Sequence, residues 1–208
     1  MKKATIFSQN NIDEIINAFS CGKVVCIPTD TVYAISCDAT NIDAIKKIYQ
    51  IKKRALSKTL PIFVSDVEMA KKYIKFFPKE LRLMEEYWPG ALTLVSEVLD
   101  NKRIPNILIS KNKIAVRAPN YRLIQTICKS IDKPIIATSA NISSQSNINN
   151  TEEIIKIFNN KVDYIIEDST LCTSNDLTPS TIIEFIEKDK FKVIREGKIS
   201  KKELDKRI

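Results

Sequence analysis

The spacing of hydrophobic residues changes repeatedly between helical and strand-like along the first half of the chain. Apolar side chains at three- and four-residue steps predict a helix that Asn10 or Asn11 caps and that ends at about Ser20. The uninterrupted apolar run at 24–27 predicts a short buried strand, and Pro28 ends it because proline cannot donate a ladder hydrogen bond.

The same reasoning applied to the rest of the chain predicts further helices at 41–50, 66–73, 78–87, 122–130, 151–158 and from residue 200. It predicts strands at 61–64, 92–98, 114–117, 134–138, 164–166, 180–186 and 191–194. Helices and strands alternate early and strands dominate late, so we expect an α/β fold with one twisted, mixed parallel and antiparallel sheet and flanking helices. Neither an internal repeat nor a long linker divides the chain, which predicts one domain over residues 1–208.

Composition excludes several kinds of active site. The chain has no histidine, which rules out a Ser-His-Asp triad and His-ligated zinc. Its three glycines, Gly22, Gly90 and Gly197, are too far apart for a Walker A loop or a G-x-G-x-x-G turn. The formal net charge of +8 suits nucleic acid or phosphorylated ligands, although scattered lysines are also common on solvated surfaces.

The cysteines and the N-terminal segment bear on localisation. The five cysteines form no C-x-x-C pair and are odd in number, which indicates reduced thiols. The first residues lack the apolar run of a signal peptide, and no apolar run reaches the roughly 18 residues of a membrane span. We therefore expect a cytoplasmic protein without a membrane partner.

Polar side chains follow two of the predicted strands at their carboxyl ends, where ligands of open α/β sheets gather. Thr29, Asp30 and Thr31 follow the first strand, and Ser139 and Asn141 follow the strand at 134–138. These residues suit recognition of a small polar molecule. They are also residue types that bond their own backbone in turns, and both interpretations remain open.

Four cations occupy comparable positions. Lys52 and Arg54 follow a predicted helix, where they either complement its dipole or converge on phosphate oxygens. Arg117 ends a strand and either clamps a carboxylate or forms a surface ion pair. Ser180 and Arg195 repeat this combination of a hydroxyl group and a cation at the end of a strand.

Seven segments, in this order, resemble the YrdC-like family of threonylcarbamoyl-adenylate synthases. They are Pro-Thr-Asp-Thr-Val-Tyr (28–33), Lys-Lys-Arg (52–54), Trp-Pro-Gly-Ala-Leu-Thr (88–93), Ala-Val-Arg-Ala-Pro-Asn (115–120), Ala-Thr-Ser-Ala-Asn (137–141), Pro-Ser-Thr (179–181) and Arg-Glu-Gly (195–197). The resemblance extends from residue 24 to residue 199 and implies a single YrdC-like domain with a basic cleft.

The resemblance also implies a reaction: L-threonine, bicarbonate and ATP condense to threonylcarbamoyl-AMP and pyrophosphate. Mg²⁺ is implied as a cofactor held by the ATP phosphates, with no metal ligand from the protein. A separate transferase then modifies adenosine 37 of tRNA, and direct tRNA binding by this chain is left open. By resemblance the catalytic residues are Lys52, Arg54, Ser139 and Asn141, the threonine-binding residues are Thr29, Thr31, Arg117, Ser139 and Ser180, and the ATP-binding residues are Lys52, Arg54, Asn141 and Arg195.

The chain departs from the family pattern at Ala34 and Ser144, where glycine is usual, and at Ala55, where proline is common. The loop at 142–150 is a candidate lid. The rival hypothesis is a non-catalytic module of the same fold that binds double-stranded RNA or tRNA. A carbamoyl-transfer domain of hydrogenase maturation shares the fold, but such proteins are longer and carry zinc-binding cysteine motifs that this chain lacks.

Overall fold

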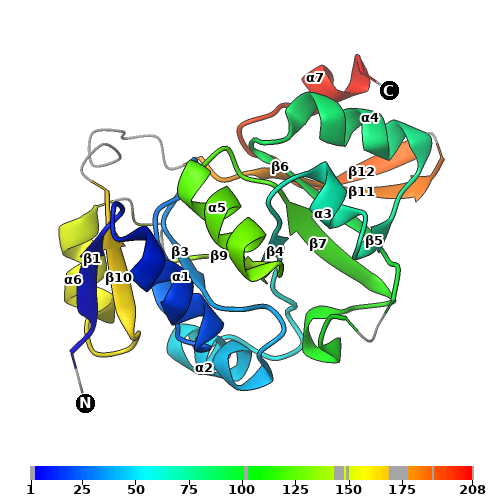
Figure 1. The fold of residues 1–208 in the computed structure, drawn as a ribbon. Helices are drawn as coiled ribbons and strands as arrows, with labels where there is room; N and C mark the ends of the chain where they lie inside the picture. Colours follow the sequence, from blue (N-terminus) through cyan, green and yellow to red (C-terminus); the bar gives the residue numbers. More distant parts are fainter. Residues whose placement is uncertain are drawn as a thin grey trace.

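The structure is a computed structural model, and it describes residues 3–100, 103–142, 148, 150–168, 178–188 and 190–207. The strands of this part of the chain form two sheets rather than the single sheet expected from the sequence (Figure 1). The five-stranded sheet has the order β1 (Thr5–Ser8), β10 (Tyr164–Glu167), β2 (Val25–Ile27), β3 (Ala34–Ser36) and β9 (Thr138–Ser139). The seven-stranded sheet has the order β12 (Lys190–Arg195), β11 (Thr181–Glu187), β6 (Leu92–Val98), β7 (Lys113–Arg117), β4 (Ile62–Phe63) and β8 (Ile135–Ile136), with β5 (Ile74–Lys75) paired to β6.

Both sheets are mixed, which confirms the predicted fold class. β1, β10 and β2 pair in parallel, as do β11 with β6 and β4 with β7, whereas the other ladders are antiparallel. The single strand predicted at 134–138 is divided in the structure. β8 pairs with β4 in one sheet and β9 pairs with β3 in the other, so the chain passes between the sheets at Ala137.

The helices are α1 (Ile12–Ser20), α2 (Ile42–Lys52), α3 (Val67–Ala70), α4 (Pro78–Tyr87), α5 (Arg122–Ile131), α6 (Thr151–Phe158) and α7 (Lys201–Asp205), with a short 3₁₀ turn η1 (Asn106–Leu108). Figure 1 shows α6 beside β1 and β10 at one end of the molecule and α4 and α7 beside β11 and β12 at the other. α1 packs against α5 in the middle.

Short polar side chains cap the starts of α2, α3, α6 and α7, whereas α1, α4 and α5 have no such cap. The carboxamide oxygen of Asn41 accepts from the backbone N–H of Ala44 at 3.0 Å, and Asp66 caps α3 in the same way through Met69 at 2.9 Å. Asn11 does not cap α1. Its side-chain oxygen instead accepts from the backbone N–H of Ser8 at 3.1 Å, which joins the helix to β1.

Candidate active site

A cavity of about 580 Å³ lies between one face of the seven-stranded sheet and the inner end of the five-stranded sheet. Successive strand residues point to opposite faces, so alternate residues along parts of β4, β6, β7, β11 and β12 line the cavity, together with Pro61 before β4. These residues are Pro61 and Phe63, Thr93 and Val95, Lys113, Ala115 and Arg117, Ile182 and Glu184, and Lys192 and Ile194. Leu94, Val116 and Ile183, on the opposite face, are fully buried in the core.

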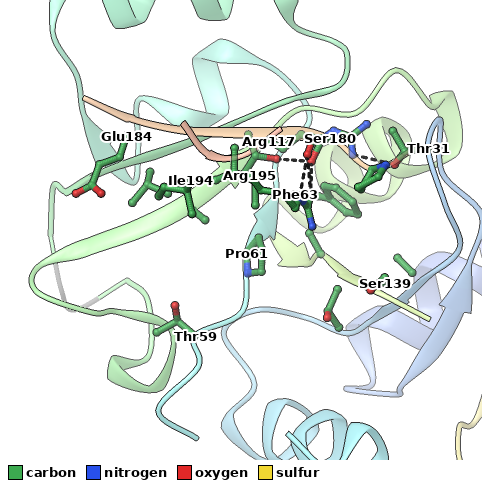
Figure 2. Close-up of a pocket in the computed structure, with 18 of the residues that line it drawn as sticks. Thr31, Thr59, Pro61, Phe63, Arg117, Ser139, Ser180, Glu184, Ile194 and Arg195 are labelled. Atoms are coloured by element: carbon green, nitrogen blue, oxygen red, sulfur yellow. Dashed lines mark hydrogen bonds between the residues drawn. The ribbon is translucent and has the colours of Figure 1, made fainter. Parts of the chain in front are cut away.

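The rest of the wall comes from the smaller sheet and from the loop after α2. The smaller sheet and the turn before it contribute Thr29, Thr31, Val32, Ala34, Thr138 and Ser139, and the loop contributes Arg54 and Thr59. Figure 2 shows Arg117, Arg195 and Ser180 gathered at one end of the cavity beside Thr31, with Glu184 at the far end.

The cavity is basic, as the family resemblance implied. Its lining contains six cations, Arg54, Lys111, Lys113, Arg117, Lys192 and Arg195. Within the described part of the chain, Glu184 is the only lining carboxylate. It is held by the ammonium groups of Lys113 at 2.5 Å and Lys192 at 2.7 Å. Positive charge therefore remains in excess around the space where an anionic ligand would lie.

Arg117 is the most constrained of these cations, and its side chain is only 5% exposed. Its guanidinium donates from Nη2 to the carboxylate of Asp30 at 2.6 Å and from Nη1 to the hydroxyl oxygen of Thr31 at 3.0 Å. Its Nε donates to the carbonyl oxygen of Gly90 at 2.8 Å. Burial lowers the pKa of Arg117, and Asp30 opposes that effect. The ion pair considered in the sequence analysis does form, but it is buried.

Arg195 reaches the same end of the cavity because β12 contains an irregularity. Arg195 pairs with Ile182 while Val193 pairs with Ile183, so Ile194 is an extra residue, and both Ile194 and Arg195 line the cavity. The guanidinium donates from Nη2 to the carbonyl oxygen of Ser180 at 2.8 Å. Burial lowers the pKa of Arg195, and the nearby charge of Arg117 lowers it further, so the two guanidinium groups interact.

Lys52 lies behind the cavity wall. Only 1% of the residue is exposed, and neither Lys52 nor Asn141 is among the described residues that line the cavity. The Lys52 ammonium donates to the carbonyl oxygens of Ser139 and Asn141, the latter at 2.8 Å, and to the carboxamide oxygen of Asn141 at 2.9 Å. The hydroxyl of Ser139 also donates to that carboxamide oxygen, at 2.9 Å. Of the four predicted catalytic residues, Arg54 and Ser139 thus line the cavity, and Lys52 and Asn141 hold Ser139 from behind the wall.

The hydroxyl groups of the predicted threonine site differ in their surroundings. The hydroxyl of Thr29 donates to the carbonyl oxygen of Val32 at 2.7 Å and accepts from two backbone N–H groups of the same turn. Thr29 therefore has the turn role that the sequence left open, although it also lines the cavity. The hydroxyl of Ser180 lies 2.8 Å from that of Thr93 and 3.2 Å from Nη2 of Arg195.

Arg54 begins the loop at 54–59 and also shapes it. Its guanidinium donates to the carbonyl oxygens of Lys58 at 2.9 Å and Thr59 at 3.0 Å. In the described part of the chain Arg54 has no carboxylate partner, so its charge is available to an anion in the cavity.

The departures from the family pattern can be assessed in part. Ala34 lies in β3, where it pairs with Ile27 and Ser139 in extended backbone that does not require glycine. Ser144 and most of the candidate lid at 142–150 lie outside the described residues. Nothing in the structure tests the roles assigned to the individual site residues, and those roles stay predictions.

The sequence analysis missed Thr93, Lys113, Glu184 and Lys192 as site residues. A partial signal exists for Thr93, Lys113 and Glu184, because each of them alternates with buried apolar residues on the opposite face of its strand. It also missed the reason for Gly197. A Cβ atom on this residue would lie 2.2 Å from the carbonyl oxygen of Pro179, so glycine allows the chain after β12 to pass beside Ser180.

The described residues contain no group of three or more Cys, Asp or Glu side chains placed to hold a metal ion. No helix among them is both long enough and apolar enough to cross a bilayer.

The buried position of Lys52 predicts a pH dependence of stability. Burial, aided by the charge of Arg54, lowers the pKa of Lys52 from 10.5 to about 8 in the folded protein. Between these values the unfolded chain binds more protons at this site than the folded chain, so this group makes stability rise with pH from about 8 toward 10.5. We expect the free energy of unfolding of the wild type, relative to Lys52→Met, to increase across that window and to be constant below it. Urea unfolding at several pH values measures this difference, and parallel pH profiles would contradict it.

The chain is similar to known proteins in both sequence and fold. The family model described as "Telomere recombination", which covers Sua5, YciO and YrdC proteins, matches residues 17–197. The threonylcarbamoyl-AMP synthase of Wigglesworthia glossinidia brevipalpis is 34% identical over 191 residues, which are 90% of this chain and 94% of that protein. The threonylcarbamoyl-AMP synthase of Vibrio parahaemolyticus is 30% identical over 165 residues, which are 77% of this chain and 88% of that protein.

Solved structures agree with these matches. The crystal structure of P. abyssi Sua5 complexed with L-threonine superposes with a TM-score of 0.86 at 26% identity. The match covers all of this chain but only 61% of the P. abyssi protein, so this chain spans less than two thirds of that relative. The crystal structure of E. coli YciO has the same fold, with a TM-score of 0.80 at 23% identity over 95% of this chain and 97% of that one.

Proposed function

Since this chain belongs to the Sua5, YciO and YrdC family, we propose that it is a threonylcarbamoyl-AMP synthase. The enzyme would condense L-threonine, bicarbonate and ATP to threonylcarbamoyl-AMP and pyrophosphate, which makes it a nucleotidyltransferase. The observation that carries the proposal is one cavity whose lining combines a pair of arginines with hydroxyl groups at one end with Arg54 and Ser139 on another wall.

The end of the cavity with Arg117 and Arg195 suits the carboxylate of threonine. Two guanidinium groups present planar N–H donors there, and the hydroxyl groups of Thr31 and Ser180 lie within hydrogen-bond distance of them. Hydroxyl groups of this kind also recognise a substrate hydroxyl, which distinguishes threonine from valine.

The wall with Arg54 and Ser139 suits the phosphates of ATP, because Arg54 lines the cavity without a carboxylate partner in the described part of the chain. The ATP phosphates would hold Mg²⁺, since the only described carboxylate in the lining is occupied by two lysines. When bound, the ion would neutralise charge on the pyrophosphate leaving group.

The reaction requires positioning more than acid–base groups. The neutral amine of threonine attacks bicarbonate to form a carbamate and release water, and a carbamate oxygen then attacks the α-phosphorus while pyrophosphate leaves. Holding three reactants in one closed space lowers the barrier to both steps, and fixed positive charge stabilises the negative oxygens that develop. A cavity of arginines, lysines and hydroxyl groups can do this without histidine.

The product is a reactive mixed anhydride, so a separate transferase would have to accept the threonylcarbamoyl group and pass it to tRNA in the cytoplasm. The rival hypothesis of an RNA-binding module predicts cations spread over an open surface. Here they converge inside a cavity whose only described aromatic lining residue is Phe63, which is 4% exposed and cannot stack on a base.

The product itself tests the proposal. Purified protein incubated with Mg²⁺, ATP, L-threonine and ¹³C-bicarbonate should form threonylcarbamoyl-AMP that carries the label, and mass spectrometry should detect it. Replacing L-threonine by L-valine should reduce the yield of the corresponding adduct at least about tenfold. Equal yields from the two amino acids would contradict the assignment of the hydroxyl-rich end.

A further inference from the structure

We propose that Asp30 is a positioning residue that makes the Arg117 end of the cavity selective for a carboxylate over a phosphate group. The proposal deepens the proposed function and rests on it, since the carboxylate concerned would be that of threonine.

Asp30 acts on Arg117 from behind the cavity wall. Its carboxylate accepts from Nη2 of Arg117 at 2.6 Å through Oδ1 and from the backbone N–H of Asn120 at 3.0 Å through Oδ2. The Asp30 side chain is 14% exposed, and the residue is not among those that line the cavity. It is therefore placed to influence a bound ligand through Arg117 rather than by direct contact.

The contacts of Arg117 fix the plane of its guanidinium group. Asp30 and Thr31 hold the two terminal nitrogens, and the carbonyl oxygen of Gly90 holds Nε. The ring of Phe63 lies 5.8 Å from the guanidinium carbon. A guanidinium fixed in this way offers directional hydrogen bonds, which suit the planar geometry of a carboxylate.

Asp30 also decides the net charge at this end of the cavity. Arg117 is buried, and a buried cation without a partner would attract most strongly the ligand with the highest negative charge, which among the substrates is the triphosphate of ATP. Asp30 cancels that charge. The ammonium of Lys198 lies 3.3 Å from the carbonyl oxygen of Asp30 and is exposed, so water and salt screen it. Arg195 then leaves one positive charge at this end, which matches the single negative charge of a carboxylate. Phosphate is thereby disfavoured where threonine must bind.

The opposing interpretation is that Asp30 and Arg117 form an ion pair that only stabilises the fold. The chain offers a matched control for it. Asp38 has a side chain that is 6% exposed and pairs with Lys133 at 2.9 Å, and neither residue lines the cavity. Asp38→Asn therefore breaks a similar pair without changing the charge of the site.

Titration of inorganic phosphate, followed by calorimetry, separates the two interpretations. We expect Asp30→Asn to bind phosphate about tenfold more tightly than the wild type, because Arg117 is then unneutralised. Asp30→Glu keeps the charge, and Asp38→Asn leaves the cavity unchanged, so both should bind phosphate as the wild type does. An unchanged phosphate affinity in Asp30→Asn would overturn the proposal.

The double variant Asp30→Asn with Arg117→Gln keeps the test decisive if the single variant folds poorly. The double variant removes both charges, so its phosphate affinity should match that of the wild type. A tenfold lower phosphate affinity would mean that Asp30 does not neutralise Arg117 in the wild type, which would overturn the proposal. Threonine titrations are run beside these measurements, and Asp30→Asn should bind threonine about tenfold more weakly. Failure of the wild type to bind threonine would refute the proposed function, whereas the phosphate measurements decide the role of Asp30 independently.

Discussion

Replacing Arg117 by alanine should weaken threonine binding about ten- to a hundredfold and lower the free energy of unfolding by about 3–5 kcal/mol. The binding loss follows from the removal of a buried, charge-assisted donor at the hydroxyl-rich end of the cavity. The stability loss follows because the carboxylate of Asp30, which pairs with Arg117 at 2.6 Å, is left buried without its counter-charge. Calorimetric titrations with threonine and with ATP, together with urea unfolding, measure both effects.

The control for Arg117→Ala is Lys133→Met, which leaves the buried carboxylate of Asp38 unpaired at a site away from the cavity. It should lower stability but leave threonine binding at the wild-type value. If Arg117→Ala lost ATP binding and kept threonine binding, the two ends of the cavity would be assigned the wrong way round.

Lys52→Met should weaken threonine and ATP together, whereas Arg54→Met should weaken ATP alone. Lys52 donates to the carbonyl oxygens of Ser139 and Asn141, so its loss removes a charge-assisted donor from each and loosens the segment that carries Ser139 into the cavity. Losing a hydrogen bond from a charged donor costs about 1.5–3 kcal/mol. Arg54 lines the cavity directly, so its loss should cost about tenfold in ATP affinity.

Lys52→Met and Arg54→Met serve as controls for each other. Each removes one positive charge from the same segment, but Lys52 is buried behind the cavity wall and Arg54 lines the cavity. Calorimetry with each ligand, on variants whose folding has been checked by circular dichroism, gives the comparison. Loss of ATP binding alone in Lys52→Met would show that the ammonium contacts phosphate directly, as the family resemblance implied, and not through Ser139 and Asn141.

The elements that the sequence predicted well have local causes. The strand at 92–98 has the predicted bounds because it is an apolar-rich run between Gly90 and Asp100, and α2 begins after Asn41 because the side chain caps it. The strand predicted at 134–138 divides between two sheets because its partners, β3 and β4, come from distant parts of the chain. Pairings of only two or three residues leave no local pattern, which also explains why β3 and β5 were missed. β1, a four-residue strand at the edge of its sheet, was missed as well.

The candidate site was predictable as a set of residues but not as a geometry. The ordered motifs identified Arg54, Arg117, Ser139 and Arg195, and the structure brings all four to one cavity. The burial of Lys52 could not be foreseen, because lysine is rarely buried and only the three acceptors around it make burial tolerable. The contact of Asp30 with Arg117 joins residues 87 positions apart, and no periodicity within a strand or helix encodes it.

Pyrophosphate release tests the central claim most directly, because it reports the step in which ATP, threonine and bicarbonate must all be present. Purified protein with Mg²⁺ and ATP should release pyrophosphate when L-threonine and bicarbonate are both supplied, and only at background rate when either is omitted. Release that is independent of threonine and bicarbonate, or no release by folded protein with all three substrates, would contradict the account.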